Sequence, residues 1–384
     1  MLKTLGAQIK EFKKDSFLTP VFMILEVLME TIIPLMMASI IDNGVEAGDI
    51  HHIYVMGGCM VIVACISLFA GTMGGKYGAR ASAGFARNLR KAMYENIQTF
   101  SFSNIDKFST AGLVTRLTTD VTNLQNAYQM LLRMCVRAPI SLICAMIMAF
   151  FINARLASVY LIAVIVLGMI LAIITVRAHH YFMEVFPKYD DLNASVQENV
   201  SAIRVVKAYV REDYEKKKFT QASKNIYNMF VKAEGVLAFN SPVMQIAVYS
   251  CIIALSWLGA KMIVAGSLTT GELMSLLTYC MNIMMSLMML SMVFVMLAMS
   301  IASAERICEV LNEKSDITNP ENPVYEVADG SVTFDHVTFR YNKTSDKPIL
   351  DDINLSIRSG ETIGVIGGTG SSKSSLVNLI SRLY

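Results

Sequence analysis

Toward the end of the chain, a run of glycine and hydroxyl residues precedes a lysine, in an order that could bind phosphate. The run comprises Gly367, Gly368, Thr369, Gly370, Ser371, Ser372, Lys373, Ser374 and Ser375. The apolar residues 362–366 before it predict a short buried strand, and an apolar helix is predicted from Lys373. Backbone N–H groups of the turn and the positive end of the helix dipole would hold phosphate oxygens. Lys373 would reach the outer phosphates, and the hydroxyl of Ser374 would hold Mg²⁺.

One position departs from the P-loop pattern GxxxxGK[ST], in which glycine precedes the lysine. Ser372 stands at that position in this chain. Glycine allows unusual backbone angles and leaves room for phosphate, whereas serine brings a Cβ into that space. We therefore expect nucleotide affinity to be weakened or lost. An ordinary serine- and glycine-rich turn that caps a helix is the alternative, but the strand before it and the Lys-Ser pair within it favour the phosphate site.

The composition indicates that most of these residues lie in a lipid bilayer. Hydrophobic residues make up 54% of the chain and charged residues only 17%, with a mean hydropathy of +0.48. Soluble domains are far less apolar. Several apolar runs are long enough to cross a hydrocarbon core of about 30 Å as α-helices. These runs are residues 17–41, 53–73, 135–152, 156–176, 242–263 and 273–301.

The distribution of charge predicts the orientation of these helices. The connections 76–133 and 177–232 are rich in Lys and Arg, whereas the connection 43–52 contains Glu46 and Asp49 and no Lys or Arg. The positive-inside rule therefore places both long connections, and both chain termini, in the cytoplasm. Both connections are rich in helix formers, so the membrane helices should continue as cytoplasmic arms about 70 Å long. The net charge of +2 gives no reason to expect a nucleic acid partner.

A change of composition marks the end of the membrane part. Turn-forming Asn and Pro residues follow the sixth apolar run, and strands are then predicted around 332–341 and 349–357. We expect a cytoplasmic N-terminal segment (1–16), a six-helix transmembrane domain (17–303), a linker (304–329) and a fragment of an α/β P-loop ATPase domain (330–384). The predicted fold class is therefore a membrane all-α domain with long cytoplasmic helical extensions, followed by that fragment.

Segments along the whole chain, in their order and spacing, resemble the ATP-binding cassette (ABC) exporters, as half-transporters of the multidrug and lipid export type. Residues 113–120 (LVTRLTTD) resemble the first cytoplasmic coupling region of that family, and residues 198–209 resemble the second. The turn 266–273 (GSLTTGEL) resembles the one between the fifth and sixth helices. Phe339-Arg340-Tyr341 matches the place of an adenine-stacking aromatic residue, although Tyr341 could instead be a packed strand tyrosine.

The resemblance implies ATP and Mg²⁺ as cofactors, with Tyr341 against adenine and residues 367–375 around the phosphates. It implies a dimer with a second half-transporter, identical or different, in the plasma membrane. Such a dimer would export hydrophobic or amphipathic solutes by alternating access. The family's signature sequence, Walker B acid and switch histidine have no counterpart here, so this chain alone is not expected to hydrolyse ATP. The alternative is a truncated or degenerate subunit that regulates or blocks a full-length partner.

Other residues suggest sites inside the membrane. Glu26 and Glu30 lie one turn apart on the first helix, with Arg137 as a possible partner, and are either functional or structurally paired. The sixth helix is rich in methionine, which suits an adaptable cavity or plain helix packing. The seven cysteines are interpreted as buried thiols, and the pairs His51-His52 and His179-His180 as surface histidines.

Overall fold

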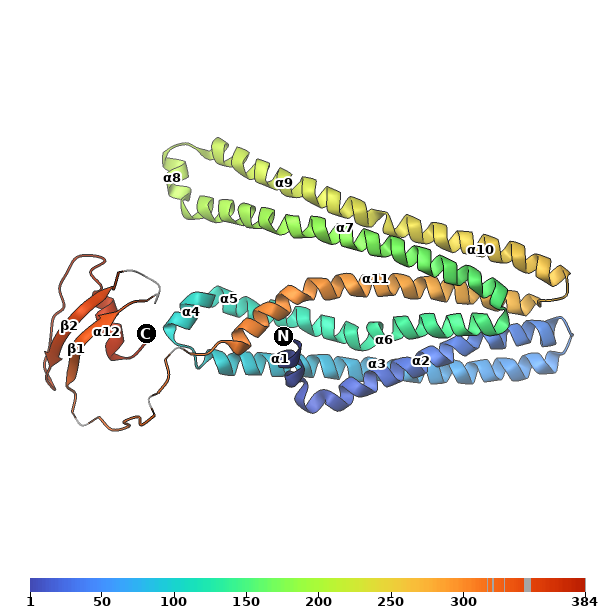
Figure 1. The fold of residues 1–384 in the computed structure, drawn as a ribbon, viewed down its shortest axis with the longest axis horizontal. Coiled ribbons are helices and arrows are strands. Elements are labelled where there is room, and N and C mark those ends of the chain that lie inside the picture. The colour runs from blue at the N-terminus through green and yellow to red at the C-terminus, as the bar shows by residue number, and fades with distance from the viewer. Residues whose placement is uncertain (316, 320, 328, 342–346, 384) are drawn as a thin grey trace. The chain divides into compact units, whose positions relative to one another are not determined.

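The computed structural model describes residues 1–315, 317–319, 321–327, 329–341 and 347–383. The chain is helical as far as Asn312 and then forms a small two-stranded sheet with one short helix (Figure 1). This architecture confirms the predicted fold class. Apolar runs in lipid become helices because every backbone N–H and C=O group must find a partner within its own segment.

All six predicted membrane runs lie within long helical stretches, in the part of the chain that the structure describes. These stretches are Leu2–Val45, Ile50–Ile97, Thr110–Ile152, Ala154–Ala178, Glu212–Val264 and Thr270–Asn312. Helices α3 (Ile50–Ile97) and α7 (Ala154–Ser201) have 48 residues each. At 1.5 Å per residue each is about 72 Å long, more than twice the thickness of a bilayer core. The predicted long arms are therefore present as continuous helices.

The remaining helices complete the membrane part and its connections. Short π-helical segments at Ile40–Val45 and Arg116–Asp120 interrupt the regular winding. The α-helices are α1 (Leu2–Gly6), α2 (Lys13–Ser39), α4 (Phe102–Phe108), α5 (Thr110–Thr115), α6 (Val121–Ile152), α8 (Ile203–Ala208), α9 (Glu212–Ala238), α10 (Asn240–Val264) and α11 (Thr270–Asn312). A 3₁₀ segment at Ala7–Phe12 joins α1 to α2.

Capping residues fix where two of the helices begin. The side-chain oxygen of Asn153 accepts hydrogen bonds from the amides of Arg155 and Leu156, both at 3.1 Å, which caps α7. At the start of α11, the Thr269 amide donates to Glu272 and the Glu272 amide donates back to the Thr269 hydroxyl. This reciprocal pair is a capping box, and it ends the short turn after α10.

The chain packs into two compact units. Unit 1 comprises Met1–Glu11, Ala83–Asn126 and Ser300–Tyr384, and unit 2 comprises Phe12–Ser82 and Ala127–Met299. Unit 2 holds most of the apolar helix length, and unit 1 holds α4, α5 and the residues that follow α11. These units reflect packing only, and the domain boundaries expected from the sequence stay predictions.

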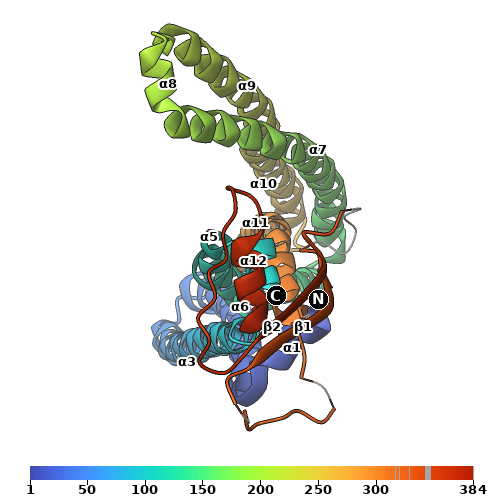
Figure 2. The ribbon, with the colours of Figure 1, turned by 90° about the vertical axis from the view of Figure 1, so that its left-hand side faces the viewer.

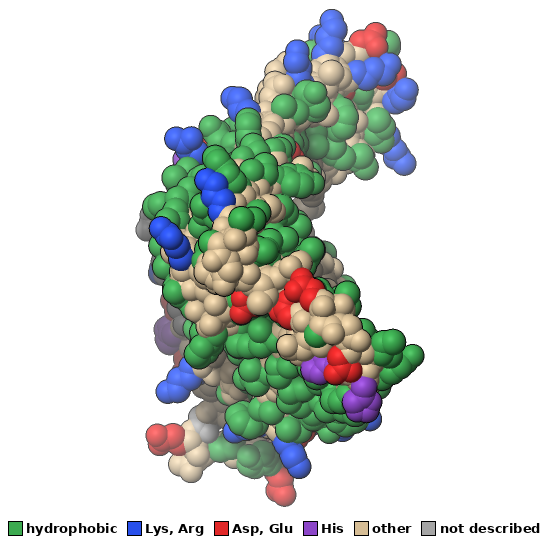
Figure 3. All heavy atoms as spheres, turned by 90° about the vertical axis from the view of Figure 1, so that its right-hand side faces the viewer, with side chains coloured by type: hydrophobic (Ala, Val, Ile, Leu, Met, Phe, Trp, Pro, Cys, Tyr) green, Lys and Arg blue, Asp and Glu red, His purple; other side chains and the backbone are tan. Residues whose placement is uncertain are grey.

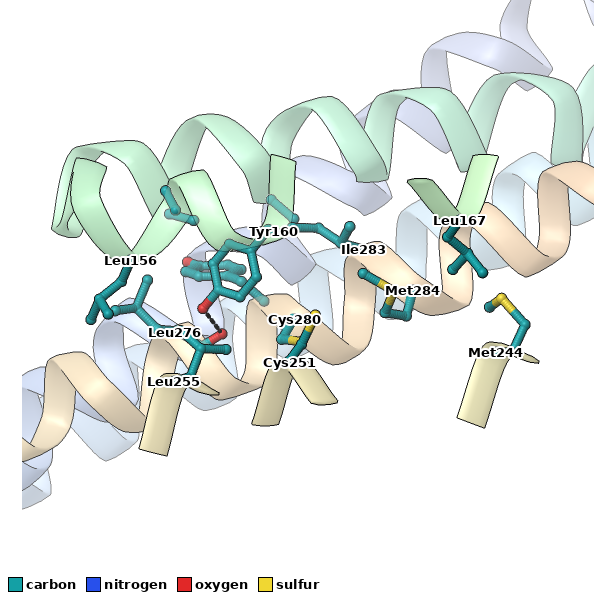
Figure 4. Close-up of a cluster of buried hydrophobic side chains, with 14 of the residues drawn as sticks. Leu156, Tyr160, Leu167, Met244, Cys251, Leu255, Leu276, Cys280, Ile283 and Met284 are labelled. Atoms are coloured by element: carbon teal, nitrogen blue, oxygen red, sulfur yellow. Dashed lines mark hydrogen bonds between the residues drawn. The ribbon is translucent and has the colours of Figure 1, made fainter. Parts of the chain in front are cut away.

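Within unit 2, a buried cluster joins α6, α7, α10 and α11 (Figure 4). Tyr160 on α7 is fully buried, and its hydroxyl donates to the carbonyl of Leu276 on α11 at 2.8 Å. Tyr279 donates in the same way to the carbonyl of Thr31 on α2 at 2.6 Å. These bonds satisfy the hydroxyl groups that the apolar interior would otherwise penalise.

Farther along, α7 runs beside α9 and α10, and α8 connects the end of α7 to the start of α9 (Figures 1 and 2).

The soluble residues of unit 1 form an antiparallel pair of strands and a helix. Strand β1 (Val332–Phe339) pairs with β2 (Leu350–Ile357), with Val332 opposite Ile357 and Phe339 opposite Leu350. Helix α12 (Lys373–Ile380) lies beside this sheet (Figure 2). The third strand predicted at 362–366 is wrong, because these residues pair with no strand and Ile366 is 97% exposed. A buried strand needs neighbours on both sides, and the described residues supply only β1 and β2.

Candidate functional site

The glycine-rich turn after β2 adopts the backbone angles that its glycines permit. Gly370 has φ of 86°, and Ser372, immediately before α12, has φ of 61° and ψ of 21°. The left-handed region costs a residue with a Cβ about 1–2 kcal/mol, whereas glycine enters it freely. The departure from the P-loop pattern therefore falls on a residue whose conformation favours glycine.

The ammonium group of Lys373 folds back over the turn. Its Nζ donates to the carbonyls of Gly367 and Gly368, both at 2.7 Å, and to the hydroxyl of Ser371 at 3.2 Å. Gly367 packs closely here, because a Cβ at this position would lie 2.6 Å from the Ser371 hydroxyl oxygen. The turn therefore encircles a positive charge, which is the electrostatic requirement for binding phosphate.

Several amides around this charge have no acceptor. Among the described residues, the N–H groups of Gly370, Lys373 and Ser374 donate to no backbone carbonyl or side chain. The first N–H groups of any helix lack a partner within it, and the helix dipole adds positive potential there. These donors next to Lys373 fit a phosphate group.

Tyr341, the expected adenine platform, lies against the same helix. The hydroxyl oxygens of Tyr341 and Ser375 are 2.9 Å apart. The rings of Tyr341 and Phe339 are nearly perpendicular, with their centroids 5.0 Å apart. Ser375 is buried, whereas Tyr341 is 43% exposed. The sequence predicts both residues as part of the site but gives no sign of their contact. That contact brings the Tyr341 ring to the helix that follows the glycine-rich turn.

The hydroxyl of Ser374 is the only metal ligand predicted in the sequence, and it lies on an exposed residue. No three His, Cys, Asp or Glu residues form a metal-binding group in the part of the chain that the structure describes. Mg²⁺ is commonly held by one or two protein ligands together with phosphate oxygens and water.

Within the membrane part, the predicted partner of the two acids is confirmed. Arg137 Nη1 donates to Glu26 at 2.6 Å, and Arg137 Nη2 donates to Glu30 at 2.9 Å. The second oxygen of Glu26 is buried without a partner among the described residues. The Glu26 side chain packs against Gly71, where an added Cβ would lie 2.9 Å from the Glu26 oxygen that Arg137 contacts. The triad therefore ties α2 to α6 beside α3.

A second charged cluster, which the sequence does not reveal, connects the first coupling region to α11 in unit 1. The carboxylate of Asp120 is 1% exposed and accepts hydrogen bonds from Ser303 Oγ at 2.9 Å and Arg306 Nε at 2.8 Å. Arg116 pairs with Glu309 at 2.8 Å. Asp120 belongs to the LVTRLTTD segment, so its position was suggested by that motif, but its partner nearly two hundred residues later was not.

The environment of Asp120 favours its charged form. This residue precedes the apolar run 135–152 by four helical turns, so it lies outside the membrane-spanning part. Burial alone would raise the pKa of Asp120, but hydrogen bonds from Arg306 and Ser303 and the charges of Arg306 and Arg116 outweigh it. The net pKa therefore lies below the ordinary value for aspartate. The cluster therefore holds the charged Asp120 carboxylate between the segments 116–120 and 303–309, which are far apart in the sequence.

The methionines of the sixth helix divide between two faces. Met284 is buried in the cluster of unit 2, whereas several others form an exposed stripe with helical spacing. The exposed ones are Met274, Met281, Met285, Met288 and Met292. The buried Met284 agrees with a role in helix packing, and the exposed stripe agrees with a lining for an adaptable cavity.

The cysteines and histidines differ partly from expectation. All seven cysteines are free thiols, and Cys251, Cys280 and Cys308 are buried as predicted. Cys59 and Cys65 are exposed on α3, because they lie on a face that other described helices do not cover. His52 contacts the Ser39 hydroxyl at 3.0 Å, and His180 approaches Glu184 at 3.2 Å. The side chain of His179 lies outside the described residues.

The fold and the site together define a class: a polytopic helical membrane protein that carries a P-loop-like turn. Comparison with known families identifies it further. The model of the ABC transporter transmembrane region matches residues 16–288. The chain therefore belongs to the ABC transporter family, as its resemblance suggested.

Relatives extend over the whole chain. An uncharacterized ABC transporter ATP-binding protein of Bacillus subtilis is 32% identical over 95% of this chain and 63% of its own length. One of Mycobacterium tuberculosis is 33% identical over 100% of this chain and 66% of its own. A protein of Mycobacterium bovis named as a fatty acid ABC transporter ATP-binding/permease protein is 26% identical over 77% of this chain and 46% of its own. The chain thus spans about two thirds of the first two.

Proposed function

We propose that this chain is a subunit of an ATP-driven exporter that moves hydrophobic or amphipathic solutes out across the membrane. The observation that carries the proposal is the turn in which the Lys373 ammonium is encircled beside free helix amides. A helical membrane domain could conduct or exchange solutes without such a turn. The presence of this turn after six membrane helices favours transport driven by nucleotide.

The nucleotide would occupy the turn and the face of Tyr341. Tyr341 stacks on adenine, residues 367–375 surround the phosphates, and the Ser374 hydroxyl binds Mg²⁺. ATP would have to replace the carbonyl partners of Lys373 with phosphate oxygens. This exchange is favourable because a charged donor gains a charged acceptor. The relatives whose names include ATP-binding support this assignment.

A second half-transporter, identical or different, completes the transporter. The free ends of the arms, around α4–α5 and α8, are the surfaces on which nucleotide domains would act. ATP-driven closure of two such domains would move the arms and reorient a central cavity. Amphipathic lipids are a reasonable class of solute, because one relative is named for fatty acids and the exposed stripe of α11 is rich in adaptable methionine.

The proposed location is the plasma membrane, with both termini in the cytoplasm. Figure 3 views the end of unit 2 that carries the short turns, where acidic side chains and histidines gather among apolar ones. The connection 43–52 contains no Lys or Arg, and connections poor in Lys and Arg are typical of the outer side of the membrane. The domain boundaries 1–16, 17–303, 304–329 and 330–384 are part of the same proposal.

Transport in membrane vesicles tests the proposal. The gene that encodes this chain is expressed in cells together with its natural downstream sequence and neighbouring half-transporter genes. Inside-out membrane vesicles are then prepared from these cells. Uptake of a fluorescent amphipathic solute should depend on ATP and should disappear with Lys373→Ala, while Lys347→Ala serves as a matched control. Uptake that persists without ATP or in Lys373→Ala would reject the motor. If the chain instead reduces the transport of a complete half-transporter, the regulatory alternative gains support.

A further inference from the structure

Two of the seven cysteines lie against each other in the interior of unit 2. Cys251 on α10 and Cys280 on α11 are 4% and 0% exposed, and Figure 4 shows their sulfur atoms side by side. Both belong to one buried cluster, to which the two helices contribute neighbouring side chains. Neither thiol takes part in the nucleotide site or in the charged clusters.

The immediate surroundings keep these thiols together. Leu255, one turn after Cys251, and Leu276, one turn before Cys280, are both fully buried in the same cluster. Nearer the turn, Gly259 lies against Leu273, where an added Cβ would be 2.5 Å from the leucine side chain. The two helices are thus closely packed from the turn to the thiol pair, and neither sulfur can move away without opening a cavity.

An apolar cavity reaches one of the two thiols. It has a volume of about 520 Å³, lies between α7 and α10, and has Cys251 in its wall. Its lining is aliphatic apart from Ser250, and it includes Ile162, Val166 and Ile246, which are exposed on the outside of these helices. Small apolar molecules dissolved in lipid can therefore approach Cys251, whereas hydrophilic ones have no favourable route.

We propose that Cys251 and Cys280 are a redox-active pair that organic hydroperoxides, such as oxidised lipid chains, convert into a disulfide. In the first step the Cys251 sulfur attacks the terminal peroxide oxygen, the O–O bond breaks, and the products are a sulfenic acid and an alcohol. In the second step the Cys280 sulfur attacks the Cys251 sulfur and water leaves. Each disulfide thus consumes two thiols and one hydroperoxide and releases one alcohol and one water.

The disulfide would add a second link between two helices that one short turn already joins. In the reduced form, α10 and α11 are held at this depth by packing of their buried side chains. Oxidised, they are covalently fixed in the middle of the membrane part, so α10 can no longer separate from α11 there. The hydrophilic reductants of the cytoplasm would reach this bond poorly, so the oxidised form should persist.

The test uses the chain in lipid nanodiscs and does not depend on transport or nucleotide binding. The protein is treated with cumene hydroperoxide, remaining thiols are blocked with a maleimide, and peptides are analysed by mass spectrometry without reduction. We expect a linked peptide containing Cys251 and Cys280 within one chain, which dithiothreitol separates after denaturation. Hydrogen peroxide at equal concentration should form this link at least about tenfold more slowly, because it partitions into water.

Variants separate this pair from general oxidation. Cys280→Ser should abolish the link and leave Cys251 oxidised to a sulfenic acid, whereas Cys135→Ser and Cys144→Ser, on α6, should leave the link unchanged. The exposed Cys59 and Cys65 report that the oxidant acted. The inference is overturned if those two react while Cys251 and Cys280 both remain free. It is equally overturned if Cys251 is oxidised to a sulfinic acid without any link to Cys280.

Discussion

Ser372 carries a conflict between sequence and conformation. It has a left-handed backbone next to Lys373. The same position is where the sequence departs from the P-loop pattern, so serine stands where the backbone conformation suits glycine better. The contact between Tyr341 and Ser375 could not be inferred, since it depends on how the strand and helix meet.

Replacing Ser372 by glycine should strengthen nucleotide binding. Glycine adopts the left-handed conformation without strain and removes the Cβ, so we expect MgATP to bind more tightly by about 1 kcal/mol, or roughly fivefold in Kd. Equilibrium titration with a fluorescent ATP analogue measures the change. Ser381→Gly is the control, because Ser381 has an ordinary φ of −85° at the far end of α12. Equal or weaker binding by the Ser372→Gly protein would show that this residue does not limit the site.

Gly271 at the start of α11 permits a close approach to α2. An added Cβ would lie 2.5 Å from the carbonyl oxygen of Ala38 and 2.7 Å from Asp42, whose carboxylate also accepts the Gly271 amide at 2.7 Å. We expect Gly271→Ala to destabilise unit 2 by about 1–3 kcal/mol through overpacking. Thermal unfolding in detergent measures the loss. Gly58→Ala on α3 is the control, since no atom lies within 4 Å of its added Cβ; a similar loss there would refute the steric explanation.

At the scale of elements, charged groups hold helices together where lipid provides no hydrophobic driving force. Arg137 with Glu26 and Glu30 joins α6 to α2, and removing only the arginine leaves two carboxylates without their partner. Arg137→Met should therefore cost roughly 3 kcal/mol or more in stability. Adding Glu26→Gln and Glu30→Gln should recover most of the loss, because no unpaired charge remains. Yields and melting temperatures in detergent measure the stability of both variants. If the triple variant recovers no stability, the triad does not act as a structural link between α2 and α6.

The cluster around Asp120 should be sensitive to acid. The lowered pKa of Asp120 means that its carboxylate binds protons more readily in the unfolded state than in the folded state. The stabilisation is therefore complete above about pH 4 and is lost as the pH falls through the lower folded pKa. Hydrogen exchange of residues 116–123 and 300–309, measured between pH 5 and pH 3, should show earlier opening at low pH. Asp120→Asn should lack most of this dependence; an unchanged profile would mean that other groups control the acid response.

Sequence patterns predicted the membrane helices better than the contacts between them. Hydrophobic length alone gives the six spans, because a bilayer demands about 20 apolar helical residues from each. The strand at 362–366 was predicted wrongly for a related reason: apolar content does not supply the neighbouring strands that a buried strand requires. The link between Asp120 and Arg306 was missed because spacing within a motif carries no information about distant partners.

For the whole molecule, the family and the membrane fold agree with a transporter. The proposed orientation rests on the distribution of charge along the sequence. The proposed topology places the connection 43–52 outside the cell and residues 203–209 inside. Single cysteines at Asn43 and at Lys207, in a cysteine-free background, test this in intact cells. A membrane-impermeant maleimide should label the cysteine at 43 readily and the cysteine at 207 only after permeabilisation. The opposite pattern would invert the topology and place the nucleotide turn on the wrong side.

The central claim is that the turn 367–375 binds the nucleotide that drives these helices. The most direct test is equilibrium binding of MgATP to the Ser372→Gly chain in nanodiscs, with and without Lys373→Ala. We expect saturable binding at one site per chain, and an affinity at least about tenfold lower when the ammonium group is removed. Absence of any binding by the Ser372→Gly chain, or binding that Lys373→Ala leaves intact, would contradict it.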